Sequence, residues 1–205
     1  MRIFRPGLLA RTIYPAGIFR LPSKERILFL SFDDGPSAGS TENILGILNR
    51  YGIRAVFFCI GKAAEEHPDL IIQIRSEGHV TGNHGYYHLD GFRTSAGKYY
   101  ENAEAADDLT SPFIFRPPYG RLTLRQYRAF RNKYHLVFWD IMAYDFDPGL
   151  ASDRSLNSLK KRIRPGSVIV LHDTPGSSVH SYLGDFIDFA VAQGYRFDIP
   201  AFLNQ

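Results

Sequence analysis

The sequence predicts a single α/β domain built on a parallel sheet of seven strands, either open or closed into a barrel. Short apolar runs rich in β-branched residues alternate along the chain with segments whose apolar residues recur at helical spacing. This order implies right-handed βαβ crossovers and therefore parallel strands. A length of 205 residues, with 44% hydrophobic and 22% charged residues, suits one ordinary globular domain with a substantial core.

The strands are predicted, in chain order, from seven apolar runs. They are ILFLSF at 27–32, AVFFCI at 55–60, HVTGN at 79–83, FIF at 113–115, LVFW at 136–139, SVIVL at 167–171 and YRFDI at 195–199. Six segments between them have helical spacing, namely 41–51, 69–77, 98–109, 123–133, 155–163 and 180–193. In the first of these helices Ile44, Leu45, Ile47 and Leu48 supply the apolar face.

The first 26 residues are a basic N-terminal segment that precedes the predicted domain at 27–205. The segment contains a single acid, Glu25, against the cations Arg2, Arg5, Arg11, Arg20, Lys24 and Arg26. We expect it to pack on the domain or to flank it. Peripheral contact with an anionic surface is the alternative.

Charge and hydropathy argue against two classes of protein. A net charge of +3 is too small to indicate nucleic-acid binding, and no basic run is interleaved with aromatic residues. No stretch approaches the roughly 20 apolar residues of a membrane-spanning helix, and no secretory signal is readable. The default location is therefore the cytoplasm, with a substrate in the cell envelope as an alternative, and the sequence does not predict the oligomeric state.

Polar residues follow five of the seven predicted strands. In parallel α/β folds the ligand site lies at the carboxyl ends of the strands, so these side chains are expected to converge. They are Asp33 and Asp34, His84 and His88, Arg116 and Tyr119, Asp140 and Asp145, and His172 and Asp173.

The histidine pair and the aspartate pair together suggest a hydrolytic metal site. His84 and His88 would share one face if they lie on a helical turn. Two imidazoles and one carboxylate leave a fourth position open, as in zinc sites that lower the pKa of bound water. Asp33 and Asp34 leave the strand in different directions, so that one can bind the metal while the other accepts a proton.

Two other interpretations compete with this one. Asp33, Asp34 and Gly35 are residue types that form turns after strands, and they can make a turn while also serving the site. His88 and Asp90 match half of the triad of two histidines and one carboxylate in non-haem iron oxygenases. The alternation of strands and helices argues against the β-sandwich of such oxygenases, and their triad would leave three polar residues without roles.

Five segments resemble, in order and spacing, the motifs of the polysaccharide deacetylases, also called the NodB homology domain or carbohydrate esterase family 4. The segments are SFDDGPS, HGYYH, FRPPYG, WDIMAYDF and VIVLHD, between residues 31 and 173. The resemblance implies a distorted (β/α)7 barrel that hydrolyses N-acetyl groups on the amino sugars of a peptidoglycan-like or chitin-like glycan. It also implies one divalent metal ion, zinc, with Co²⁺, Ni²⁺ or Mn²⁺ as alternatives.

The resemblance also assigns roles to residues. It implies Asp33 as catalytic base and His172 as general acid, tuned by Asp145, while Arg116 orients the base and the Tyr119 N–H helps to hold the oxyanion. The implied metal ligands are Asp34, His84 and His88. The implied substrate contacts are Pro118, Tyr119, Val170 and Leu171, with Val170 in the place of a leucine that contacts the acetyl methyl.

Three departures from the family pattern affect the metal loop and the placement of substrate. Gly85 replaces the usual Ser or Thr, while Met142 and Phe146 stand where an Asp and a Trp are expected. None of them removes a ligand, the base or the acid. Two alternatives therefore stay open: an O-acetyl esterase acting on acetylated glycans, and a carbohydrate-binding relative with weak turnover.

Overall fold

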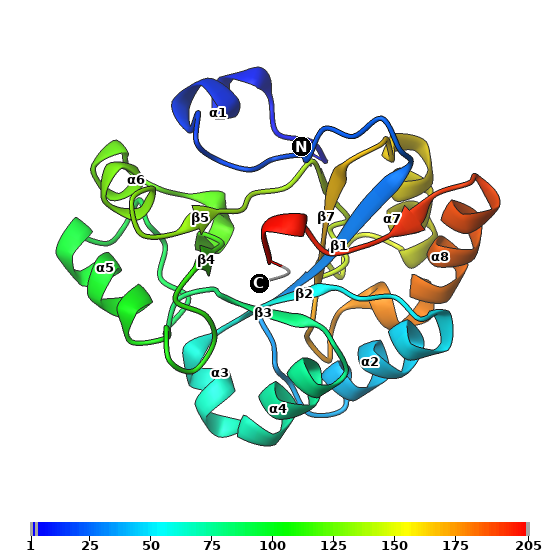
Figure 1. Cartoon of the computed structure of the whole chain (residues 1–205), viewed down its shortest axis with the longest axis horizontal. Coiled ribbons are helices and arrows are strands. Elements are labelled where there is room, and N and C mark those ends of the chain that lie inside the picture. Colours follow the sequence, from blue (N-terminus) through cyan, green and yellow to red (C-terminus); the bar gives the residue numbers. More distant parts are fainter. Residues whose placement is uncertain (1, 3, 204–205) are drawn as a thin grey trace.

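The chain forms a curled parallel sheet that is surrounded by helices (Figure 1). The computed structural model describes residue 2 and residues 4–203. The strands are β1 Ile27–Asp33, β2 Val56–Cys59, β3 Val80–Asn83, β4 Ile114–Phe115, β5 His135–Leu136, β6 Ile141–Met142, β7 Ser167–His172 and β8 Arg196–Phe197. All pairs between these strands are parallel, in the order β5-β4-β3-β2-β1-β7-β6, with β8 also on β1. The predicted single α/β domain with a barrel-like sheet is confirmed.

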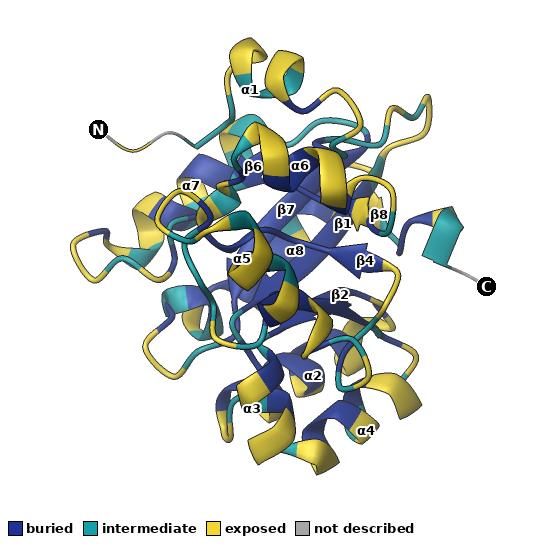
Figure 2. Ribbon diagram, turned by 90° about the vertical axis from the view of Figure 1, so that its left-hand side faces the viewer, coloured by how far each residue is buried: buried dark blue, intermediate teal, exposed yellow. Residues whose placement is uncertain are grey.

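Every predicted helix is present, and the described residues add two short α-helices, as well as 3₁₀ helices, that the sequence did not predict. The α-helices are α1 Leu8–Ile13, α2 Ser40–Tyr51, α3 Gly61–Glu66, α4 Pro68–Ser76, α5 Ala96–Glu104, α6 Leu124–Phe130, α7 Ser152–Arg162 and α8 Leu183–Ala192. The 3₁₀ helices are η1 Pro118–Gly120, η2 Ser178–Ser181 and η3 Ala201–Leu203. In α2 the predicted apolar face is buried, and Gly52 ends the helix with a φ of 62°. Figure 2 shows buried and exposed faces on helices around the sheet.

One predicted strand is divided in the structure. Leu136 in β5 pairs with β4, whereas Met142 in β6 pairs with β7. The strand predicted at 136–139 therefore begins in β5 and ends before β6. We call residues 135–142 the seam, because they link the two ends of the sheet. Ile18 lies beside the seam, where its N–H donates to Leu136 and its carbonyl accepts from Phe138, both at 2.8 Å.

The N-terminal segment is held by one buried carboxylate of the seam. The Asp140 side chain is fully buried, and it lies 3.4 Å from Arg5 and 3.2 Å from Arg11. It also accepts hydrogen bonds from Arg164 and Ser167. Burial acts to raise the pKa of Asp140, but these hydrogen bonds and the arginine charges lower it. Two of the basic residues therefore neutralise a charge within the fold.

The interior of the barrel is closed at its amino-terminal end. Phe29, Val56 and Val168 form part of an apolar cluster there, and Phe202 of η3 packs against it. In Figure 1 η3, in red, lies over the centre of the ring. The carboxyl ends of the strands are at the opposite end. None of the helices in the described part of the chain has the length and apolar character needed to cross a membrane.

Candidate metal centre and active site

A cavity of about 350 Å³ lies at the carboxyl ends of the strands. Its lining includes residues from the ends of β1, β3 and β7 and from the loops after β4 and β6. The lining residues are Asp33, Asp34, His84, His88, Pro117, Tyr119, Arg121, Trp139, Met142, Tyr144, Phe146 and His172. The structure therefore brings together most of the polar residues that were predicted from the strand ends.

Three side chains in this cavity lie close enough together to hold one metal ion, and we call them the triad. Asp34 Oδ1 lies 3.2 Å from His88 Nε2 and 3.5 Å from His84 Nε2, and one ligand atom from each residue lies within 4.8 Å of the others. Asp34 Oδ1 is buried and has no hydrogen-bond partner among the described residues. Burial acts to raise the pKa of Asp34, but the neighbouring imidazoles lower it below its usual range. An ionised, unsatisfied oxygen facing two imidazoles fits a bound cation.

The protonation state of His84 suits a ligand. Its Nδ1 is 2.7 Å from the Arg116 carbonyl, which can only accept, so Nδ1 carries the proton and Nε2 presents its lone pair to Asp34. Burial lowers the pKa of His84 to about 4, and the imidazole is therefore neutral near pH 7. A backbone carbonyl that fixes the tautomer in this way is a common support for histidine ligands.

The backbone is strained at several of these positions. Asp34, His88 and Tyr119 have φ values of 76°, 52° and 59°, in the left-handed region that few residues other than glycine adopt. Each such residue costs about 1–3 kcal/mol, and such strain clusters at functional sites. His84 and His88 come together without lying on a helical turn. Residues 84–88 form a bent loop, in which the two imidazole centroids lie 4.9 Å apart.

Two asparagines that were not predicted as site residues shape this loop. Asn83 Oδ1 accepts from the Gly85 N–H at 2.7 Å, and Asn102 Oδ1 accepts from the Tyr87 N–H at 2.9 Å. Gly85 has a φ of 74°, and a Cβ there would lie 2.7 Å from Asn102 Nδ2. The surroundings therefore favour the glycine that departs from the family pattern, because a side chain there would be strained. The sequence signal for Asn83 was only its position at the end of a predicted strand.

Asp33 is held by a buried arginine. Arg116 Nη1 donates to Asp33 Oδ1 at 2.5 Å and to Ser31 Oγ at 2.8 Å. The guanidinium is fully buried, donates to two carbonyls of the seam, and lies 4.0 Å above the ring of Phe58. This fixes Asp33 with Oδ2 3.9 Å from His84 Nε2, beside the triad.

His172 is held by a buried carboxylate on the other side of the cavity. Its Nδ1 lies 2.9 Å from Asp145 Oδ1, while Asp145 Oδ2 accepts hydrogen bonds from the main-chain N–H of His172 and from Ser177 Oγ. Burial acts to lower the pKa of His172, but the charge of Asp145 and its hydrogen bond raise it to about 9. The imidazolium is therefore the main form near pH 7. Phe146 packs edge-on against it at 4.5 Å between ring centroids.

Of the predicted substrate contacts, one lies at the rim of the cavity and the other three are buried in the protein. Tyr119 is exposed at the rim, with its ring 4.7 Å from the ring of His88. Pro118, Val170 and Leu171 are buried and are not among the residues that line the cavity. Pro117 lines it instead of Pro118.

Two carboxylates that the sequence placed near the site lie outside the triad. Asp90, the candidate iron ligand, pairs with Arg121 at 2.6 Å. Asp173 accepts hydrogen bonds from Ser40 and Thr41, both at 2.6 Å, beneath the loop after β1. Neither residue therefore supplies a ligand in this arrangement.

Residues 20–137 match the family model described as Polysaccharide deacetylase. A peptidoglycan-N-acetylglucosamine deacetylase of Bacillus cereus is 31% identical over 85% of this chain, which spans 66% of that protein. A chitooligosaccharide deacetylase of a Bradyrhizobium strain is 32% identical, over 74% of this chain and 72% of its own length. A crystal structure of the Bc1960 peptidoglycan N-acetylglucosamine deacetylase superposes with a TM-score of 0.85 at 29% identity and covers 92% of each chain.

Proposed function

Because this chain belongs to the polysaccharide deacetylase family, we propose that it is a metal-dependent hydrolase that removes N-acetyl groups from the amino sugars of a glycan. The observation that carries the proposal is the pairing of two buried networks across one cavity. Arg116 holds Asp33 on one side, and Asp145 holds His172 on the other. The matched relatives act on peptidoglycan and on chitooligosaccharides, so a glycan of either kind is the proposed substrate.

Asp33 and His172 each carry out one of the two proton transfers that the reaction needs. Asp33, fixed by Arg116 and next to the triad, accepts a proton from the attacking water as general base. His172, charged near pH 7, donates a proton to the leaving amine. The main-chain N–H of Tyr119 is the proposed donor to the developing oxyanion, because Tyr119 lines the cavity beside His88.

Asp34, His84 and His88 are the proposed ligands of one divalent metal ion. Two imidazoles and one carboxylate are a donor set typical of zinc, and Co²⁺, Ni²⁺ and Mn²⁺ are alternatives to be tested. The ion, when bound, would polarise the acetyl carbonyl and lower the pKa of a water molecule. The unsatisfied Oδ1 of Asp34 supports this assignment.

The test is acetate release from a panel of N-acetylated and O-acetylated glycans, measured with and without a chelator. We expect release from an N-acetylated glycan, its loss with the chelator, and its recovery when Zn²⁺ is added back. Release from the O-acetylated glycans alone would replace the proposal with an esterase function. If no glycan releases acetate even with added metal, the chain is a binding relative and the proposal fails.

A further inference from the structure

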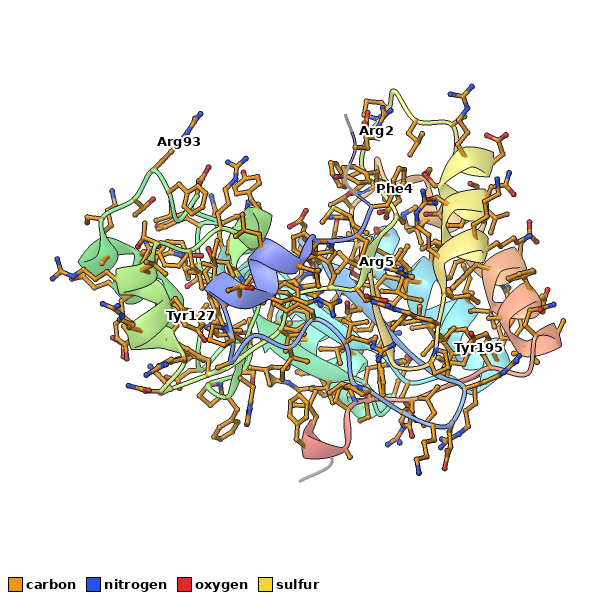
Figure 3. All side chains as sticks on the ribbon, turned by 90° about the horizontal axis from the view of Figure 1, so that it is seen from above. Arg2, Phe4, Arg5, Arg93, Tyr127 and Tyr195 are labelled. Atoms are coloured by element: carbon orange, nitrogen blue, oxygen red, sulfur yellow. The ribbon has the colours of Figure 1, made fainter. Side chains whose placement is uncertain are left out.

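A second cavity, of about 540 Å³, lies between the start of the chain and α7. We call it the basic cavity, because four of its lining side chains are cationic and none of the described residues that line it is acidic. The four are Arg2, Arg154, Lys161 and Arg162. Figure 3 shows Arg2 and Phe4, which also lines the cavity, next to α7 in yellow.

Two of the four cations are already paired. Arg2 lies 2.6 Å from Asp147, and Arg162 donates to the carbonyl and the hydroxyl of Ser158. Arg154 and Lys161 are exposed and make no side-chain hydrogen bond or ion pair with any residue in the described part of the chain. Only Arg2 has a counter-charge among the described residues, so the basic cavity presents three uncompensated positive charges, and two of them, on Arg154 and Lys161, have no polar side-chain partner either.

The dipole of α7 favours a positive charge at the position of Lys161 but not at the position of Arg154. Lys161 lies in the last turn of α7, where a cation interacts favourably with the helix dipole. Arg154 lies in the first turn, where the same dipole disfavours a cation. The two residues are seven positions apart and share one helix face, about 10 Å from each other along the axis. An anionic ligand would account for the position of Arg154.

The basic cavity adjoins the 350 Å³ cavity that holds the proposed active site, which we call the catalytic cavity. Phe4 lines the first, Tyr144 lines the second, and their rings meet edge-on with centroids 5.1 Å apart. α7 follows β6 and returns antiparallel to the strands, so its first turn lies toward their carboxyl ends, where the catalytic cavity opens. A polymer held in the catalytic cavity would therefore extend past Tyr144 toward Arg154.

We propose that the basic cavity binds a carboxylate carried by the glycan beside the sugar that is deacetylated. This inference rests on the proposed function and narrows its substrate to an acidic N-acetylated glycan. Arg154 binds the carboxylate through its planar fork of N–H donors, and Lys161 adds a second charge along the same face. Both residues set affinity and take no part in the chemical step.

The experiment compares two forms of one N-acetylated oligosaccharide. One form carries a carboxylate on alternate sugars, and in the other each carboxylate is converted to a neutral methylamide. The variants are Arg154→Gln with Lys161→Gln together and, as the matched control, Lys160→Gln. Lys160 lies on the same helix over the ring of Phe189 at 5.1 Å, and it does not line the basic cavity.

For the double variant we expect KM on the acidic form to rise about fivefold to tenfold with kcat unchanged, as two partly exposed charge contacts would give. KM on the methylamide form should not change, and Lys160→Gln should alter neither value. Added NaCl should raise the KM of the unmodified protein on the acidic form only.

An unchanged KM on the acidic form, or an equal rise on both forms, would overturn the inference while leaving the proposed function intact. Failure of the unmodified protein to release acetate from either form would count against the proposed function instead. Binding of the acidic oligosaccharide by calorimetry gives a readout that is independent of turnover. The double variant should bind it more weakly by the same factor.

Discussion

Asp33 and Asp34 are neighbours with different surroundings, and these surroundings support the different roles proposed for them. Asp33 receives the Nη1 donor of Arg116, whereas Asp34 Oδ1 faces two imidazoles without a hydrogen bond. The turn at Gly35 and Pro36 presents both carboxylates at the end of β1. The turn interpretation and the metal interpretation are therefore compatible.

The first prediction tests Asp33. In Asp33→Asn the amide oxygen can still accept from Arg116, so the fold and metal content should be retained while the melting temperature falls. The rate of deacetylation should drop by about a hundredfold or more, the scale of a positioned general base. Steady-state kinetics and metal analysis of the same preparation provide the measurement. Loss of metal together with activity would mean that the roles of Asp33 and Asp34 are reversed.

The second prediction tests the ligand set. His84→Ala removes the imidazole whose tautomer is fixed by the Arg116 carbonyl, so bound metal should fall from about one equivalent to a small fraction. His67→Ala is the control, because His67 lies outside the triad at the start of α4. Elemental analysis after purification without chelator measures the change. Full metal content in the His84 variant would show that the assignment is wrong.

The third prediction concerns the pH profile. A His172 pKa of about 9 keeps this proposed general acid protonated below that pH, so kcat/KM should decline as the pH rises through about 9. Asp145→Asn removes the charge that favours the imidazolium, so the decline should begin at lower pH. His172→Ala should abolish this limb. An unmoved limb in the Asp145 variant would mean that another group orients the acid.

At the residue scale, the sequence revealed the groups that stand at strand ends but not those that support them. Asp33, His84 and His172 could be identified because a parallel sheet places its carboxyl ends at one edge. Asn102 could not, because it lies on α5 and reaches the metal loop only through the fold. The contacts of Arg116 with the seam carbonyls were also hidden, since they depend on the register of neighbouring strands.

The loop between β3 and α5 gives the fourth prediction, at the scale of an element. Gly85→Ser introduces the residue type usual in the family, but the φ of 74° and the 2.7 Å approach to Asn102 oppose it. We expect a loss of about 1–2 kcal/mol in the free energy of unfolding from the left-handed backbone, together with weaker metal binding. Chemical denaturation and metal titration measure the two effects.

Gly97→Ser is the matched control for this loop. Gly97 lies in α5, where a Cβ would meet no atom within 4 Å. The control should leave metal binding unchanged and should not destabilise the fold, because serine is a better helix former than glycine. If Gly85→Ser behaves like the control, Asn102 does not constrain the loop.

Element lengths explain which parts of the fold the sequence could predict. Long runs such as β1 and α2 show a clear pattern over several residues, and both were found. β6 comprises only Ile141 and Met142, too short for any periodicity. α1 buries none of its residues, so it has no apolar face for a pattern to reveal.

At the scale of the whole molecule, Asp140 joins the N-terminal segment to the seam, which gives the fifth prediction. Asp140→Asn leaves Arg5, Arg11 and Arg164 without their shared counter-charge. Breaking a buried pair costs about 3–5 kcal/mol, and we expect roughly half of that here because the arginines are partly exposed. Urea denaturation measures the loss, and hydrogen exchange should show reduced protection over 4–20.

Asp147→Asn serves as the control for this variant, since Asp147 pairs with Arg2 in an exposed position. Its free energy of unfolding should change little, because exposed ion pairs contribute little to stability. Equal stability of the two variants would show that Asp140 does not anchor the segment.

The contact between the N-terminal segment and the seam also affects how copies of this molecule meet at high concentration. An open strand edge is a template on which another chain can add a strand, and this is a common route to aggregation. Here the N–H of Phe138 is bonded to Ile18 at 2.8 Å, and the N–H of Met142 to Phe4 at 3.0 Å. Ile18 and Phe4 therefore protect this edge of the sheet from aggregation. They occupy main-chain N–H donors of the seam to which a strand of a second copy would otherwise bind.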